Sequence, residues 1–173
     1  MKSLPYNWRI SKYDPALRDT QGHYLAEDWS FFAQIGQLFN GRRLTYEEYV
    51  SVENTYVRSA LRFLTDAGLR SLKISELALP NTVFSADGGL QGIRLRPESL
   101  HDKAIVGRDQ IEDVIKLNLR EATWCELQEV DRFYLHFGWD YYLYVGSTSP
   151  SSRAIGDTAE DGLYVEVKAS PYL

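Results

Sequence analysis

The side chains most able to do chemistry in this sequence are three histidines and one cysteine, and they are widely separated. His23, His101 and His136 lack the paired spacing of zinc-binding motifs, and Cys125 has no second cysteine with which to form a disulfide bond. The apolar neighbours of Cys125 predict a buried strand position. The sequence therefore predicts neither a metal site nor a cofactor, and the lone cysteine fits a reducing cytoplasm.

His136 is the histidine whose surroundings most resemble a site. It falls in a predicted strand, on the same side as Tyr134 and four residues before Asp140. A histidine in this setting is typical of a polar cluster at the rim of a sheet, which is the arrangement we expect. The alternative is a general base, or a small-molecule pocket lined by Tyr134, His136 and Trp139.

Other catalytic patterns are absent from the sequence. There is no Gly-x-Ser-x-Gly turn, and the glycine-rich segment 88–92 is not followed by the Lys-Ser/Thr pair or the helix start of a phosphate-binding loop. Adjacent carboxylates such as Glu112 and Asp113 point apart on a helix and are usually solvated. We therefore expect a protein that binds a partner rather than an enzyme.

A dense aromatic segment, residues 133–146, distinguishes the last third of the chain. In a hairpin, side chains alternate between the two faces of the sheet. The side chains expected to face the core are Phe133, Leu135, Phe137, Leu143 and Val145. Those expected on the outward face and in the turn form a candidate partner-binding surface: Tyr134, His136, Trp139, Asp140, Tyr142 and Tyr144. The alternative is that helices cover this face.

The net charge of −5 is unevenly distributed along the chain. Residues 1–120 contain 15 acidic and 16 basic side chains, a balance of +1, whereas residues 121–173 contain 9 acidic and 3 basic ones, a balance of −6. Asp157, Glu160 and Asp161 belong to this acidic excess and extend the candidate surface. A negative surface does not suit phosphate backbones, so we expect no nucleic-acid partner. A cationic protein partner fits, and solubility alone is the alternative.

Two segments have the pattern of amphipathic helices. Thr45 and Glu48 match a capping box, apolar residues then recur at helical spacing, and Gly68 supplies a stop, which predicts a helix over 46–67. A second apolar stripe predicts a helix over 108–121.

The remaining patterns favour strands and turns. Strands are predicted at 7–13, 69–79, 123–130, 133–137, 141–145 and 163–167, with a further possible strand at 23–29. Helix or loop is expected at 31–39, turns at 82–101 and a polar loop at 147–162. Together they predict a single α+β domain over 1–173, a mostly antiparallel sheet with a C-terminal meander packed against two main helices. No signal-peptide core or membrane-spanning stretch is present, so we expect no membrane partner and a cytoplasmic location.

Two motifs near the C-terminus carry a resemblance. The stretch His136-Phe137-Gly138-Trp139-Asp140-Tyr141-Tyr142-Leu143-Tyr144, with the ending Gly162-Leu163-Tyr164-Val165-Glu166 through Ser170-Pro171-Tyr172, resembles a group of small bacterial proteins. These are similar to immunity proteins of contact-dependent growth inhibition and other polymorphic toxin systems. The resemblance implies a non-catalytic module that binds a cationic toxin domain through its acidic, aromatic surface.

Overall fold

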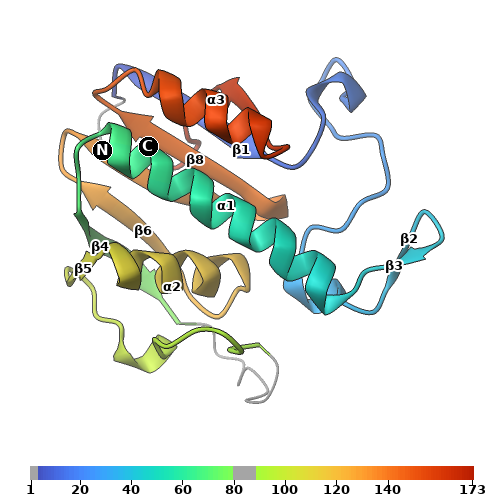
Figure 1. Ribbon diagram of the computed structural model, residues 1–173, viewed down its shortest axis with the longest axis horizontal. Coiled ribbons are helices and arrows are strands. Elements are labelled where there is room, and N and C mark those ends of the chain that lie inside the picture. The colour runs from blue at the N-terminus through green and yellow to red at the C-terminus, as the bar shows by residue number, and fades with distance from the viewer. Residues whose placement is uncertain (1–3, 80–88) are drawn as a thin grey trace.

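One antiparallel sheet organises the molecule (Figure 1). The computed structural model describes residues 4–79 and 89–173, and in these residues the sheet has seven strands in the order β5-β4-β6-β7-β8-β1-β9. The strands are β1 (Tyr6–Ser11), β4 (Ser71–Ala78), β5 (Ile105–Gly107), β6 (Trp124–Glu129), β7 (Phe133–Gly138), β8 (Tyr142–Ser147) and β9 (Tyr164–Val167). A separate hairpin of β2 (Leu38–Phe39) and β3 (Arg42–Arg43) projects from the main body. The predicted α+β class and C-terminal meander, β6-β7-β8, are confirmed.

Three helices cover one face of the sheet in the described part of the chain (Figure 1). The first, α1 (Tyr46–Asp66), begins where the Thr45 hydroxyl accepts a hydrogen bond from the Glu48 backbone N–H at 3.1 Å, as the capping box predicts. The others, α2 (Arg108–Leu119) and α3 (Ser152–Glu160), lie on either side of α1. Both predicted helices are confirmed to within two residues at their ends.

The helix α3 corrects the expectation of a polar loop over 147–162. Its start lacks a local cap, because Ser151 has left-handed backbone, φ 47°, and its side chain caps nothing. Instead, Asp66 Oδ2 at the end of α1 accepts a hydrogen bond from the Ala154 N–H at 2.9 Å, across 88 positions of sequence. Buried hydroxyls of Ser59 and Thr158 meet at 2.8 Å between the two helices. The cap of α3 and its buried hydroxyl contact come from α1, so part of what stabilises this helix lies outside its own segment.

Two further expectations concern segments before α1. The possible strand at 23–29 does not form, and only an isolated bridge joins Arg18 to Tyr24. The segment 31–39, expected to be helix or loop, is a loop with one short 3₁₀ turn that leads into β2. The turns expected at 82–101, and the glycine-rich segment 88–92, begin outside the described residues.

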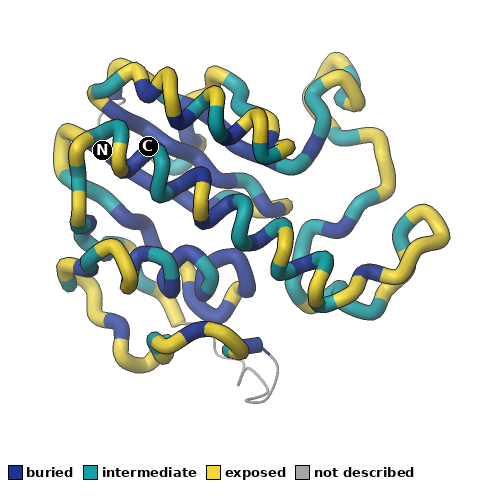
Figure 2. Tube along the Cα trace, viewed as in Figure 1, coloured by how far each residue is buried: buried dark blue, intermediate teal, exposed yellow. Residues whose placement is uncertain are grey.

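The core lies between the helices and the sheet (Figure 2). The expected inward residues are all buried there: Phe133, Leu135, Phe137, Leu143 and Val145. Cys125 has no exposed surface, as predicted, and burial raises the pKa of its thiol to about 11. The strand β1 pairs with β8 on one side and β9 on the other, so this early segment of the chain is an interior strand of the sheet.

A buried ion pair fastens the two long helices together. Arg120, directly after α2, donates from Nε and Nη2 to the two carboxylate oxygens of Glu53 in α1, at 2.7 and 2.5 Å. Its Nη1 also donates to the carbonyl oxygens of Gly89 and Gln91, at 3.0 and 2.9 Å. Both side chains are shielded from water, and removing one partner of such a pair costs about 3–5 kcal/mol because a buried charge remains. The pair therefore fixes where α2 ends.

Two glycines offer a matched test of how closely β8 packs against the Tyr134 ring. A methyl group added at Gly146 in β8 would lie 2.0 Å from the Tyr134 ring, whereas one added at Gly156 in α3 meets no atom within 4 Å. We expect Gly146→Ala to lower the free energy of unfolding by about 1–3 kcal/mol through overpacking. Gly156→Ala should leave it unchanged or raise it by about 0.5–1 kcal/mol, since alanine favours helix. Urea denaturation measures both, and equal effects would contradict the close approach of β8 to Tyr134.

Candidate functional site

The outward tyrosine face expected from the sequence is covered. Tyr134 and His136 have no exposed surface and Tyr144 is 6% exposed, although all three do point away from the helices. The expectation of an open face is therefore wrong for these residues. The alternative, a covering by helices, is also wrong, because the two ends of the chain cover the face instead.

The covering segments are the residues that precede β1 and follow β9. Leu4 and Tyr172 pack with Tyr134 and Tyr144 in a second, smaller apolar cluster. The Tyr172 ring lies 6.3 Å from that of Tyr144 and 6.0 Å from that of Trp124, measured between centroids, so the C-terminal segment crosses several strands. Aromatic side chains on both faces thus serve packing, which their large apolar area favours.

His136 lies in a row with two groups that could serve a hydrolase. Its Nδ1 is 2.9 Å from Ser170 Oγ, and its Nε2 is 3.5 Å from Glu126 Oε2. All three residues are buried, and Ser170 Oγ also accepts a hydrogen bond from the Tyr172 N–H at 3.2 Å. A nucleophile needs adjacent space for the reacting atom, and neither cavity described below is lined by this row. The arrangement holds the C-terminal segment against the sheet.

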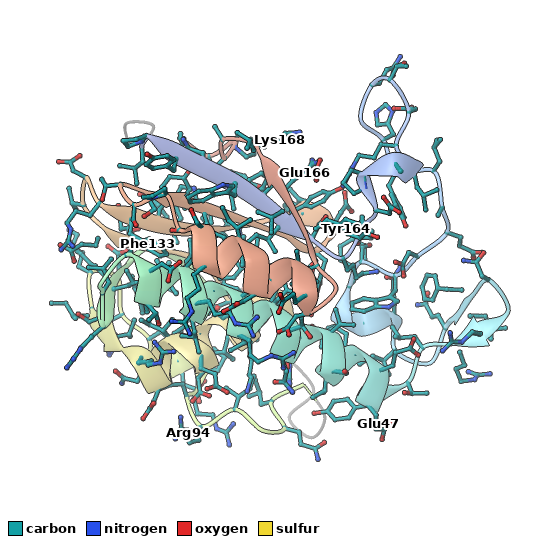
Figure 3. The ribbon with its side chains drawn as sticks, turned by 45° about the horizontal axis from the view of Figure 1, so that its top comes forward. Glu47, Arg94, Phe133, Tyr164, Glu166 and Lys168 are labelled. Carbon is teal, nitrogen blue, oxygen red and sulfur yellow. The ribbon has the colours of Figure 1, made fainter. Side chains whose placement is uncertain are left out.

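Tyr142 of β8, on the same face as Tyr144, packs against charged side chains from β1, from the loop after β1 and from the edge strand β9. Its hydroxyl accepts a hydrogen bond from Arg18 Nη1 at 2.8 Å, and the Arg9 guanidinium lies 4.8 Å from the ring centre. Arg9 is in turn held by Glu166 of β9, with Nε and Nη2 donating to the carboxylate at 3.1 and 2.9 Å. Figure 3 shows Glu166 on this edge strand, between Tyr164 and Lys168. Tyr142 is therefore half-buried and already bound within the protein.

The acidic residues of α3 are largely paired with α1. Arg62 Nη1 and Arg58 Nε lie 2.8 and 3.0 Å from Asp161 Oδ2, and Arg62 also approaches the Asp157 carboxylate at 3.8 Å. Although burial acts to raise the pKa of Asp161, the two arginines hold it below its usual range. Glu160 is exposed. Asp157 and Asp161, two of the nine acidic residues of the last third, are thus paired with arginines about a hundred positions earlier, 103 for Arg58 and Asp161.

Within the aromatic segment 133–146, the β7–β8 turn is the part most exposed to solvent. Trp139 is 73% exposed, whereas the other three tryptophans are 37% exposed or less. Asp140 and Tyr141 follow it with left-handed backbone, φ 60° and 64°. Aspartate tolerates this conformation, but for tyrosine it costs about 1–3 kcal/mol. The surrounding structure offsets that strain by burying the Tyr141 ring among Trp29, Tyr49 and Tyr56.

A cavity of about 210 Å³ opens beside this turn, at one end of the sheet. Four segments that are far apart in sequence contribute to it, and its described lining consists of Ser30, Phe31, Ala78, Leu79, Asn118, Leu119, Glu121, Thr123, Trp124, Phe137, Gly138, Trp139, Asp140 and Tyr141. The lining is mainly apolar and aromatic. We call this feature the Trp139 cavity.

The polar groups of the Trp139 cavity are few. Asn118 is fully engaged, since its Nδ2 donates to the Val114 carbonyl at 3.0 Å and its Oδ1 accepts from the Cys125 N–H at 2.8 Å. The Thr123 side chain is almost fully buried, and its Oγ1 has no hydrogen-bond partner among the described residues. Burial raises the pKa of the Glu121 carboxyl. A buried hydroxyl without a partner is costly, and a ligand could satisfy it.

Sequence reasoning identified Trp139 and Asp140 but missed the rest of the cavity. Phe31, Glu121, Thr123 and Trp124 converge on the turn from a loop, the end of α2 and the start of β6. No local pattern connects these positions. Their convergence depends on the antiparallel pairing that brings the start of β6 and the end of β7 to the same end of the sheet.

A second depression lies at the base of the β2–β3 hairpin, lined by residues such as Asp28, Trp29 and Arg42. Near it, Lys12 is buried against Asp28, with Nζ 2.5 Å from Oδ2, and over the Trp29 ring at 4.1 Å. Burial lowers the pKa of Lys12 to about 8 despite the carboxylate. Both the Asp28 ion pair and the ring contact lie within the protein, so this lysine serves to fix the loop against β1.

Known proteins offer no template for this chain. No protein-family model matches it, and no significant match is found among curated proteins or solved structures. Among the described residues, no group of three His, Cys, Asp or Glu side chains is placed to share a metal ion. In the same residues, no helix is both long and apolar enough to cross a bilayer.

The buried His136 makes stability depend on pH. Burial lowers its pKa to about 4, from 6.5 in an unfolded chain. Between these values the unfolded state binds the proton and the folded state does not, so stability falls as pH falls from 6.5 towards 4, by up to about 3 kcal/mol. As pH falls through this window, we expect wild type to lose more free energy of unfolding than His136→Gln, so the difference between the two proteins shrinks. Urea denaturation at pH 7 and pH 5 measures it, and parallel pH dependences would contradict the neutral buried histidine.

Proposed function

We propose that this protein is a non-catalytic protein-binding module of the immunity type, which binds and neutralises a cognate bacterial toxin domain in the cytoplasm. The single observation that carries the proposal is the exposed Trp139 on a strained turn beside an apolar cavity. Exposed tryptophans at such positions are typical of interface hot spots, because they bury a large area with few rotatable bonds. The proposed interface is centred on Trp139 and Asp140, not on the covered tyrosines.

The size of the cavity favours a protein partner over a free small molecule. Small-molecule sites usually have volumes of about 300–1,000 Å³. The Trp139 cavity, at about 210 Å³, is smaller, and its aromatic rim is exposed around it. Such a shape suits one anchoring side chain of a larger partner. The alternative pocket around His136 has no support in the arrangement, because His136 is fully buried and does not line this cavity.

Trp139→Ser tests the proposal. We expect this variant to bind the toxin domain encoded beside its own gene at least about 30-fold more weakly than wild type, since hot-spot truncations cost about 2 kcal/mol or more. Isothermal titration calorimetry measures the affinity, and thermal melting shows that the variant stays folded, because the side chain is largely outside the core.

Ile105→Ser is the matched control. Ile105 is 74% exposed, like Trp139, but lies in the edge strand β5, which is separated from β7 by two strands. Its replacement should leave affinity within about twofold, since scattered surface substitutions have small effects. Unchanged binding by Trp139→Ser, or an equal loss in both variants, would contradict an interface at the turn.

A further inference from the structure

The Trp139 cavity is mainly apolar, but the charged side chains in its described lining are all acidic. Among the described lining residues no side chain is basic, and the charged ones are the carboxylates Glu121 and Asp140. Both carboxylates belong to residues with left-handed backbone, Glu121 at φ 59° and Asp140 at φ 60°. They approach the cavity from separate segments, after α2 and between β7 and β8. The charge that reaches the cavity is therefore negative.

The end of α2 adds to this negative character. Leu119 is the last residue of this 12-residue helix and lines the cavity together with Asn118. A helix of this length carries a partial negative charge at its C-terminus, equivalent to about half an elementary charge. The buried ion pair between Arg120 and Glu53 holds this end in place and is itself internally neutral. The Leu119 carbonyl oxygen already accepts a hydrogen bond from the Tyr49 hydroxyl at 3.1 Å, so the helix dipole only adds to the preference for a cation that the two carboxylates set.

The aromatic walls suit a cation that has an apolar body. Phe31, Trp124, Phe137, Trp139 and Tyr141 supply the rings. The faces of aromatic rings attract cations, tryptophan most strongly, and the interaction strengthens when water is excluded. A guanidinium group is planar, weakly hydrated and able to stack on such rings, which distinguishes it from a compact ammonium group.

Thr123 supplies an independent sign of a missing ligand. Its side chain lines the cavity, is almost fully buried, and has an Oγ1 without a hydrogen-bond partner in the described part of the chain. A hydroxyl oxygen can accept a hydrogen bond from a ligand N–H, whereas an aliphatic ligand would leave it unsatisfied. The lining therefore offers a hydroxyl acceptor among its apolar side chains and two carboxylates for a charged head.

We propose that the Trp139 cavity binds the side chain of an arginine, with its aliphatic stem against the aromatic walls and its guanidinium group held by Glu121, Asp140 and the Thr123 hydroxyl. That the arginine belongs to a protein partner rests on the proposed function. The binding of an arginine side chain in the cavity does not depend on the proposed function. An arginine is also the basic residue most enriched at hot spots, so the same cavity would select a cationic toxin surface.

A small arginine probe tests the cavity on the isolated protein. Nα-acetyl-arginine N-methylamide is titrated into ¹⁵N-labelled protein, and the indole N–H signals of Trp139 and Trp124 are followed by NMR. The matched probe is the citrulline analogue, which has nearly the same shape and no charge. We expect saturable shifts with the arginine probe and about tenfold weaker binding of the citrulline probe, a difference of 1.4 kcal/mol.

Paired charge variants locate the effect. Asp140→Asn with Glu121→Gln removes both carboxylates while keeping side-chain size, and asparagine tolerates left-handed backbone. We expect this double variant to lose most of the arginine preference. The control combines Glu98→Gln with Glu160→Gln, two exposed residues outside the cavity lining, for the same change in net charge. The control should keep the preference.

The outcomes separate this inference from the proposed function. Equal binding of the two probes, absence of any indole shift, or an equal loss in both double variants would overturn the arginine site, even if Trp139→Ser still abolished toxin binding. Selective arginine binding with no toxin affinity would support the site and count against the proposed partner. Binding of both arginine and toxin, each weakened by the cavity variants, supports the two together.

Discussion

The left-handed backbone of Tyr141 is the constraint on which the exposed β7–β8 turn and the Trp139 cavity depend. Its ring packs against Trp29, Tyr49 and Tyr56 in the core, and the chain accepts φ 64° to place it there. The turn therefore cannot also bury Trp139, which is left in solvent. A strained residue persists only where surrounding contacts determine its position, and three aromatic rings do so here. The same insertion forms one wall of the Trp139 cavity.

On the face of the sheet away from the helices, residues that an alternating pattern predicts to be exposed are buried by the segments before β1 and after β9. Tyr134, His136 and Tyr144 alternate as a hairpin requires, yet Leu4 and Tyr172 cover them. The hydrogen bond between His136 Nδ1 and Ser170 satisfies one of the two ring nitrogens that this covering buries, while Nε2 lies 3.5 Å from Glu126 with no hydrogen-bond partner among the described residues. The covered face stabilises the sheet, and the binding surface that we propose moves to the end of the strands.

Tertiary contacts also pair part of the acidic excess with arginines from an earlier part of the chain. The last third has an excess of acidic residues in sequence, but Arg58 and Arg62 of α1 pair with Asp157 of α3 and with Asp161 directly after it. What remains near the cavity is a small group, Glu121 and Asp140, next to the end of α2. A few carboxylates beside aromatic walls discriminate between partners more sharply than a diffuse negative face, because a partner must fit the walls as well as match the charge.

The sequence by itself determined the local elements: the capping box of α1, the amphipathic stripe of α2 and the alternation of the meander each depend on neighbours within a few positions. It also placed the core residues of β7 and β8 and singled out Trp139 and Asp140. The tertiary structure alone decided the rest, including the cap that Asp66 provides for α3, the covering of His136 and the convergence of Glu121, Thr123 and Trp124 on the cavity. The physical reason is the same in each case. These features depend on contacts between segments far apart in the chain, and periodicity reports only which side of its own element a residue faces.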